Sequence, residues 1–225
     1  MGKGKFGFRI GPDFERPKKE IIEKLKQYST PPLSDGLNKF NTVDPEIKPV
    51  RRDIKIAGPA MTVRLRPADN LMLHKAISMA REGDVIVVDT CGCRNYSIMG
   101  DLMATTLVAK KIAGIVIDGG VRDIEELREK GYPVFARFVT PAVGDKSGPG
   151  EINYPICCGG VPVMPGDYVV GDQNGVVVIP PDQVEGIIEN TDKKLAYEAQ
   201  RIIDIQNGKY DKPDIDEKLR KANVI

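Results

Sequence analysis

Short apolar segments alternate with amphipathic ones through the middle of the chain, and this alternation restricts the fold more than any other feature. DVIVVD (84–89) and IVID (115–118) are short and almost wholly apolar, as buried strands are, and 132–138 follows the same pattern. Segments with helical periodicity, 100–114 and 122–131, lie between them. Two consecutive βαβ units imply parallel strands that are covered by helices and joined by right-handed crossovers. The sequence therefore predicts an α/β fold with a parallel core.

Helix signals flank these units on the N-terminal side. The periodicity predicts helices over 14–28 and 70–83, a short helix that starts within 30–40, and one or two strands over 54–65. Ser34 or Asp35 is the expected cap of the short helix. Gly83 and Gly114 are expected to end the helices that precede them, because glycine readily adopts the left-handed conformation.

The C-terminal third has a different pattern. Turn residues at 165–167 and 173–175 separate β-branched segments, which is typical of antiparallel hairpins, and a long charged helix is predicted over 181–207. Residues 139–160 are rich in Gly and Pro and show no pattern. With no repeat and no low-complexity linker, we expect one domain over 1–225, with an N-terminal helical extension at about 1–30 and C-terminal helices with a tail at about 181–225.

The charge balance and the lack of long apolar segments restrict the partners and the location. The chain of 225 residues has 33 Lys and Arg against 32 Asp and Glu, a net charge of +1, so no global field attracts nucleic acid or an anionic membrane. Neither a signal peptide nor a membrane-spanning segment is recognisable. We expect a soluble, cytoplasmic protein that binds neither nucleic acid nor membrane.

Cysteine and histidine are sparse. The four cysteines occur as Cys91-Gly92-Cys93 and Cys157-Cys158, and neither pair has the CxxC spacing of a zinc or redox motif. We expect reduced thiols; pairing across the two clusters, as a disulfide or a soft-metal site, is the alternative. His74 is the only histidine, which excludes a His-rich metal site.

Two glycine-containing loops follow predicted parallel strands, at the sheet edge where ligands bind in such folds. The first runs from Asp89 to Leu102 and contains Gly100 and Asp101 just before a helix, where free N–H groups form an anion site suited to a carboxylate. The second, 118–123, ends in Arg122 and Asp123.

Arg122 and Asp123 bring complementary chemistry to the second loop. The planar fork of Arg122 can bind a carboxylate or an enolate oxygen in a bidentate manner. Asp123 offers the hard oxygen that Mg²⁺ or Mn²⁺ prefers, and Asp101 could fix one of the waters that such an ion retains. The structural alternative is that both acids cap helices and that Arg122 pairs with one of them.

The segment GDLMATTLVAKKIAGIVIDGGVRD resembles the family that contains 4-hydroxy-4-methyl-2-oxoglutarate aldolase and the RraA-type regulator of ribonuclease E. The mark of this family is an Asp, twenty residues and then Arg-Asp, which Asp101 and Arg122-Asp123 match. The resemblance extends through GPAMTV, GDVIVVD, YPVFAR and VPVMPGDYVVGDQNGVVVIP, over about 30–205.

The resemblance implies a swivelling β/β/α fold and a class II pyruvate aldolase, assembled as a homotrimer or hexamer with sites between subunits. It implies that Asp123 holds a Mg²⁺ or Mn²⁺ ion and that Arg122 stabilises an enolate. The substrate carboxylate would rest on the amides of Gly100, Asp101, Leu102 and Met103. An acid from the neighbouring subunit would lie near the metal; Glu198 is the best match, and Glu189 or Asp192 are the alternatives.

The implied substrate is a 4-hydroxy-2-oxo acid that loses its hydroxyl proton to a water oriented by Asp101 and is cleaved to pyruvate. The same site would decarboxylate oxaloacetate. A protein-binding regulator of ribonuclease E with a vestigial site is the alternative.

Two further alternatives concern single residues. A Schiff-base mechanism would need a desolvated lysine, and Lys110, Lys111 and Lys130, at or near predicted helix ends, do not suit it. His74 could carry protons in the pocket, although a helix-face histidine with ordinary hydrogen bonds is the simpler expectation.

Overall fold

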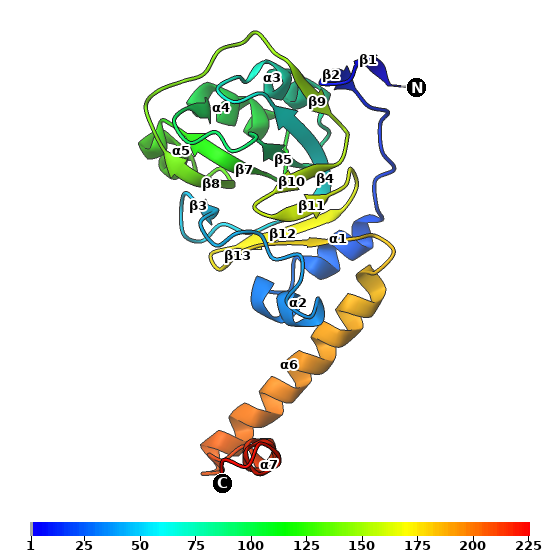
Figure 1. The fold of residues 1–225 in the computed structure, drawn as a ribbon, viewed down its shortest axis with the longest axis vertical. Coiled ribbons are helices and arrows are strands. Elements are labelled where there is room, and N and C mark those ends of the chain that lie inside the picture. The colour runs from blue at the N-terminus through cyan, green and yellow to red at the C-terminus, as the bar shows by residue number, and fades with distance from the viewer. Residues whose placement is uncertain (1) are drawn as a thin grey trace.

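A computed structural model describes residues 2–225 and places a mixed sheet at the centre of the molecule (Figure 1). Its four central strands run parallel and are, in spatial order, β4 (Ile56–Leu65), β5 (Val85–Asp89), β7 (Gly114–Val121) and β8 (Val134–Val139). They are connected by the helices α3 (Leu71–Met79), α4 (Asp101–Ala109) and α5 (Ile124–Lys130). The two predicted βαβ units are confirmed, and β4–α3–β5 adds a third.

Alternate side chains of the central strands enter two different cores, because successive residues of a strand point to opposite faces. Ile86 and Val88 of β5 pack with α3, α4 and α5, whereas Val85 and Val87 pack against a second β-layer. That layer consists of β10 (Ile156–Cys158), β11 (Val161–Val163), β12 (Tyr168–Asp172) and β13 (Gly175–Ile179). The order of layers is therefore β/β/α, as the family resemblance implies.

A third core lies on the outer side of β12 and β13. Tyr168 and Val177 are buried there against the helices α1 (Lys19–Leu25), α2 (Thr30–Gly36) and the first turns of α6 (Val184–Gln206). Beyond these turns α6 projects away from the body and ends beside α7 (Pro213–Lys221), as Figure 1 shows. Within 2–225 no helix is both long enough and apolar enough to cross a membrane.

Short strands extend the central sheet at its edges. On one side β9 (Gly150–Ile152), β2 (Phe8–Ile10) and β1 (Lys3–Lys5) continue the sheet beyond β4. On the other side β3 (Lys48–Pro49) pairs with β8. Within the sheet, β6 (Ser97–Met99) pairs with the end of β7, on the edge of β7 that faces β5.

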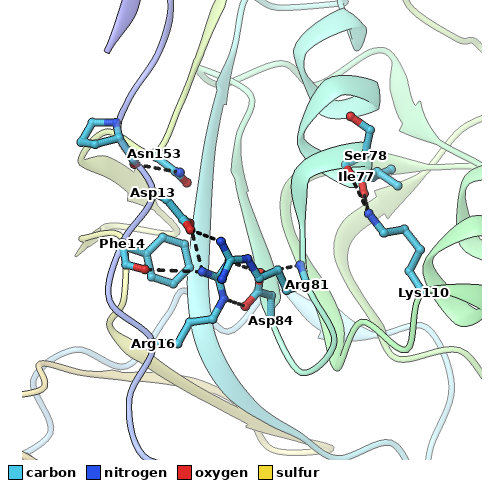
Figure 2. Close-up of polar contacts among 10 residues, drawn as sticks. Asp13, Phe14, Arg16, Ile77, Ser78, Arg81, Asp84, Lys110 and Asn153 are labelled. Atoms are coloured by element: carbon cyan, nitrogen blue, oxygen red, sulfur yellow. Dashed lines mark hydrogen bonds and ion pairs between the residues drawn. The ribbon is translucent and has the colours of Figure 1, made fainter. Parts of the chain in front are cut away.

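The N-terminal extension differs from the helical prediction. It begins with the β1–β2 hairpin, and only 19–25 of the predicted helix over 14–28 is helical. The preceding residues cross the domain in extended form because Arg16 donates two hydrogen bonds of 2.8 Å to the fully buried carboxylate of Asp84 (Figure 2). Sequence periodicity does not reveal this long-range ion pair.

Several predicted helix boundaries were wrong. In α2, Thr30 is the first residue and Pro31 and Pro32 occupy the first turn, where no N–H donor is needed, so Ser34 and Asp35 lie inside the helix rather than capping it.

The predicted glycine stops were wrong as well. The helix α3 ends at Met79, and Gly83 adopts φ +86° in the turn that follows. Gly114 starts β7 instead of ending α4, and a Cβ at this position would lie 2.5 Å from Cγ2 of Ile56. Its role is therefore close strand packing.

One of the two predicted hairpins is confirmed. β12 and β13 pair antiparallel across the turn at 173–174. The turn at 165–167 forms no hairpin, because β11 pairs with β10 across Gly159 and Gly160 while β12 pairs with β4. The unpatterned segment 139–160 supplies β9 and β10, whose three residues each are too few to show a period.

Candidate functional site

The two loops predicted to bear the site meet because of the short strand β6. β6 pairs in parallel with the end of β7, with Ser97 opposite Gly120 and Met99 opposite Val121. The N–H of Arg122 continues the pairing with a 3.0 Å hydrogen bond to the carbonyl of Met99. β6 and β7 end side by side. The Gly100–Asp101 pair, which follows β6, and the Arg122–Asp123 pair, which follows β7, are therefore neighbours.

Asp123 joins the two loops through its carboxylate. Oδ2 accepts a 2.9 Å hydrogen bond from the N–H of Asp101 at the start of α4 and lies 3.6 Å from Nε of Arg122. The backbone of Asp123 is left-handed, with φ +56°. Gly100 makes this approach possible: a Cβ there would lie 2.3 Å from Oδ2 of Asp123 and 3.0 Å from Nε of Arg122.

The carboxylate of Asp101 is paired with Lys130. The Nζ of Lys130, in the last turn of α5, forms an ion pair with Oδ1 of Asp101 and donates a 3.0 Å hydrogen bond to the hydroxyl of Thr105. The sequence indicated only that Lys130 ends a helix. Helical periodicity does not reveal that α5 returns its C-terminal end to the start of α4.

All three central residues, Asp101, Arg122 and Asp123, face one small pocket of about 100 Å³, hereafter the Arg122 pocket. Their side chains are partly exposed, which leaves them accessible to a small ligand. The pocket is lined by Asn70, His74, Met99, Gly100, Asp101, Leu102, Met103, Arg122, Asp123, Val143 and Lys146. The site residues predicted within one chain therefore converge, including the predicted substrate-binding segment Gly100–Met103.

Other lining residues of the pocket come from α3 and from the segment that was unpatterned in the sequence. His74 lies on α3 one turn after Asn70, the residue that precedes the helix, and Val143 and Lys146 lie on the neighbouring loop. Burial, and to a lesser extent the charge of Lys146, lower the pKa of His74. The expectation of ordinary hydrogen bonds for His74 was wrong: its Nε2 is buried without a partner among the described residues.

The lysines considered, and not favoured, for a Schiff base have other contacts. Nζ of Lys110 donates to the carbonyls of Ile77 and Ser78 at 2.7 and 2.8 Å, where it satisfies the C-terminal end of α3 (Figure 2). Lys111 is exposed and lies 3.7 Å from Glu82. Neither lysine lines the Arg122 pocket.

The acidic candidates on α6 do not join the pocket within one protomer. Glu198 lies on the projecting part of α6, 3.5 Å from Nζ of Lys194. Glu189 pairs with Lys193 at 2.6 Å, and Asp192 accepts a 2.6 Å hydrogen bond from the hydroxyl of Tyr28. None of the three acids lines the Arg122 pocket, so a contribution of α6 to this site requires a second subunit.

The donor set of one chain suits only a sparsely ligated metal. Among residues 2–225 no cluster of three or more His, Cys, Asp or Glu side chains could hold an ion. Within the same residues Oδ1 of Asp123 accepts no hydrogen bond, which leaves one hard oxygen available in a polar pocket. A single carboxylate of this kind fits Mg²⁺, which retains most of its waters.

The cysteines take no part in the Arg122 pocket. Cys91 donates its N–H to Asp89 at 2.7 Å, and its sulfur lies 3.3 Å from Nε of Arg64. All four are free thiols; Cys91 and Cys157 are exposed, whereas Cys93 and Cys158 are buried. Of the first predicted loop, only its end at Met99 to Leu102 lines the pocket.

Comparison with known proteins adds to this geometry. Residues 30–178 match the family model described as RraA-like, Aldolase/RraA. The chain is 40% identical over 182 residues to a putative 4-hydroxy-4-methyl-2-oxoglutarate aldolase of Halalkalibacterium halodurans, which covers 81% of this chain and 87% of that protein. It is 34% identical to the 4-hydroxy-4-methyl-2-oxoglutarate aldolase of Thermus thermophilus, over 56% of this chain and 76% of that protein.

Solved structures agree with the fold. Streptomyces coelicolor RraAS2, described as an unusual member of the RNase ES inhibitor RraA protein family, superposes with a TM-score of 0.77 at 28% identity. The superposition covers 84% of this chain and 98% of that one. The relatives therefore include proteins named as aldolases and proteins named as inhibitors of RNA processing.

Proposed function

This chain belongs to the RraA-like family, and we propose that it is a lyase that cleaves a 4-hydroxy-2-oxo acid to release pyruvate. The observation that carries the proposal is the convergence of Asp101, Arg122 and Asp123 on one pocket at the start of α4. The aldolase names of the relatives agree with it.

The start of α4 provides the anion-binding part of the site. The N–H groups of the first helical turn have no intrahelical acceptor, and that of Asp101 is already bonded to Asp123. The N–H groups of Leu102 and Met103 therefore remain available for the carboxylate of a 2-oxo acid, and the helix dipole favours its negative charge. Arg122 adds a full positive charge beside them.

A divalent cation, Mg²⁺ or Mn²⁺, would be held by Asp123 and by an acid of α6 from a neighbouring subunit, with Glu198 as the best candidate. When bound, such a cation supplies Lewis-acid polarisation of the 2-oxo group. Arg122 is placed to hydrogen-bond the oxygen on which charge develops, and its fork fixes the plane of the enolate.

Asp101 is placed to orient a water for proton transfer. The ion pair with Lys130 keeps its carboxylate in one position at the entrance of α4. Cleavage of the C3–C4 bond leaves pyruvate enolate, and protonation at C3 releases pyruvate. Oxaloacetate decarboxylation passes through the same enolate, so we propose it as a side activity of this site.

We also propose a cytoplasmic homotrimer or hexamer with sites between subunits. The small volume of the Arg122 pocket in one protomer supports an incomplete site, since pockets for small ligands usually enclose about 300 Å³ or more. The projecting part of α6 exposes Tyr197 and Ile202 by 55% and 56%, which suits burial against another copy.

The second candidate is a protein-binding regulator of ribonuclease E activity, favoured by the structural relatives named as inhibitors. A regulator needs no charged residues gathered in a pocket. The two functions differ in one measurable property, which is turnover of a 2-oxo acid.

The test is pyruvate release from 4-hydroxy-4-methyl-2-oxoglutarate and from oxaloacetate, with Mg²⁺, with Mn²⁺ and with EDTA. We expect metal-dependent release that Asp123→Asn abolishes and that the control Asp211→Asn, at an exposed position, leaves intact. If the wild-type chain released no pyruvate with either metal and instead inhibited ribonuclease E, the regulator would be the better assignment.

A further inference from the structure

Two residues that line the Arg122 pocket each carry a buried polar atom with no hydrogen-bond partner among the described residues. These atoms are Oδ1 of Asn70 and Nε2 of His74. Asn70 is 3% exposed, and both residues line the pocket. A buried polar atom without a partner destabilises the fold, so folded proteins rarely retain two of them close together without a use.

Hydrogen bonds of its side chain and backbone fix the position of Asn70. Its Oδ1 therefore lacks a partner because of the surrounding fold. Its Nδ2 donates a 3.0 Å hydrogen bond to the carbonyl of Ile98, so Oδ1 is the atom left without a partner. Its backbone N–H donates to the carbonyl of Asp145 at 2.9 Å, which fixes the loop that bears Lys146. The backbone N–H of His74 in turn donates to the carbonyl of Asn70 at 3.1 Å.

The surroundings of His74 favour the neutral imidazole over the imidazolium. Burial and the neighbouring charge of Lys146 both lower its pKa. The other charged groups that line the pocket are Asp101, Arg122 and Asp123. A neutral imidazole has one ring nitrogen with a free lone pair, which can accept a proton.

The two sets of lining residues are expected to contact different parts of the substrate. If the pyruvyl unit occupies the amides of α4 and Arg122, as the proposed function requires, the part of the substrate beyond C3 extends toward α3 and Lys146. The hydroxyl on C4 is a hydrogen-bond donor, and Oδ1 of Asn70 and Nε2 of His74 both lack partners among the described residues. Nε2 can accept when the ring proton is on Nδ1. Binding the hydroxyl would satisfy at least one of them.

We propose that His74 is a catalytic residue of the carbon–carbon cleavage: Nε2 takes the proton of the C4 hydroxyl. This inference rests on the proposed function and replaces the water expected as the acceptor of that proton. As the O–H bond breaks, a C4=O bond forms, the C3–C4 bond breaks, and its electron pair passes to the pyruvate enolate. The imidazolium then releases its proton to solvent, and the enolate carbon takes a proton from water.

Comparing the two reactions proposed for this site distinguishes a specific role of His74 in proton removal from a general role in keeping the pocket intact. Retro-aldol cleavage must remove the C4 hydroxyl proton, whereas oxaloacetate has no such hydroxyl and loses CO₂ instead. Both reactions share the enolate and therefore Arg122. A base for the hydroxyl is needed in the first reaction only.

The test compares His74→Gln with Lys75→Ala, an exposed residue of the same helix, in both reactions with Mg²⁺. We expect His74→Gln to lose about 100-fold or more of kcat for retro-aldol cleavage. Its oxaloacetate decarboxylation should stay within a few-fold of wild type, and Lys75→Ala should retain both. Unchanged cleavage, or equal loss of both reactions, would overturn the role of His74. A wild-type chain inactive in both would overturn the proposed function itself.

A binding measurement supplies a readout that is independent of turnover. His74 is the only histidine, so its imidazole gives a single set of side-chain signals in an NMR spectrum. We expect 2,4-dihydroxyglutarate, which lacks the 2-oxo group and cannot be cleaved, to shift these signals. 2-Hydroxyglutarate, which lacks the C4 hydroxyl, should shift them far less; equal shifts from both ligands would contradict the contact.

Discussion

Asp123 serves the fold and the site with the same side chain. One oxygen caps the first N–H of α4, and the other remains available on the pocket side. The structural alternative expected this acid to cap the helix that it precedes, but its side chain makes no cap bond to α5 and bonds the first N–H of α4 instead. This contact does not exclude a ligand. The cap fixes the carboxylate, which is what a metal ligand requires.

Turnover is expected to depend on the planar guanidinium group of Arg122. Replacing Arg122 by Lys keeps the charge and removes the planar fork, so we expect a loss of about 100-fold or more in kcat. The fold should survive, because the side chain is 41% exposed. Steady-state kinetics together with circular dichroism check this, and turnover at the wild-type rate would remove Arg122 from the mechanism.

The position of the Asp123 carboxylate is expected to depend on the missing side chain of Gly100. A methyl group there would lie 2.3 Å from Oδ2 of Asp123, so Gly100→Ala must displace the carboxylate. Because φ at this position is −144°, the backbone itself tolerates alanine. We expect a loss of about 100-fold in turnover with little change in melting temperature. The control Gly186→Ala has open space and should leave turnover unchanged; equal effects of the two changes would argue against a role for Gly100 in positioning.

At the level of elements, two ion pairs to buried carboxylates hold the N-terminal segment against the sheet, Arg9–Glu151 and Arg16–Asp84. Arg16 is the partner of the fully buried Asp84, so Arg16→Ala leaves a carboxylate without its cation and should cost about 3 kcal/mol of unfolding free energy. The control is Arg81→Ala, whose side chain pairs with the half-exposed Asp13 and should cost less than about 1 kcal/mol. Urea denaturation measures both, and similar losses would mean that the segment is held elsewhere.

The junction between α2 and the β12–β13 turn gives a pH prediction. Burial raises the pKa of Asp172, but hydrogen bonds from Thr30 and Asn174 outweigh this and leave the pKa below its usual value. The folded protein thus favours the charged form, and the stabilisation is complete above the pKa of the unfolded chain, about 3.9, and is lost as the pH falls through the lower folded pKa.

The matching variant is Asp172→Asn, which places an amide NH₂ against the N–H of Thr30. We expect it to be about 1–3 kcal/mol less stable at pH 7 and to lose less further stability between pH 4 and pH 2 than the wild type. Unfolding midpoints in urea at several pH values measure this, and parallel pH curves for the two proteins would show that Asp172 does not titrate in this way.

At the scale of the whole molecule, the sequence predicted what depends on local periodicity. The parallel order of β5, β7 and β8 follows from buried apolar segments that alternate with helices, and the meeting of Gly100 with Arg122 follows from their places at strand ends. What it missed depends on distant contacts: β6 is three residues long, and the Arg16–Asp84 and Lys130–Asp101 pairs join segments far apart in the sequence. The unsatisfied His74 was likewise invisible, because spacing does not show which hydrogen bonds a side chain lacks.

The proposed lyase activity requires a single arrangement, in which Asp123 holds a hard cation and Arg122 faces the enolate in the assembled protein. Crystals grown with Mn²⁺ and oxalate, a stable stand-in for pyruvate enolate, test it by anomalous diffraction at the manganese edge. We predict a manganese peak about 2.1 Å from the Asp123 carboxylate, with oxalate between the cation, Arg122 and the amides of α4. Manganese bound elsewhere, or oxalate without contact to Arg122, would contradict the account.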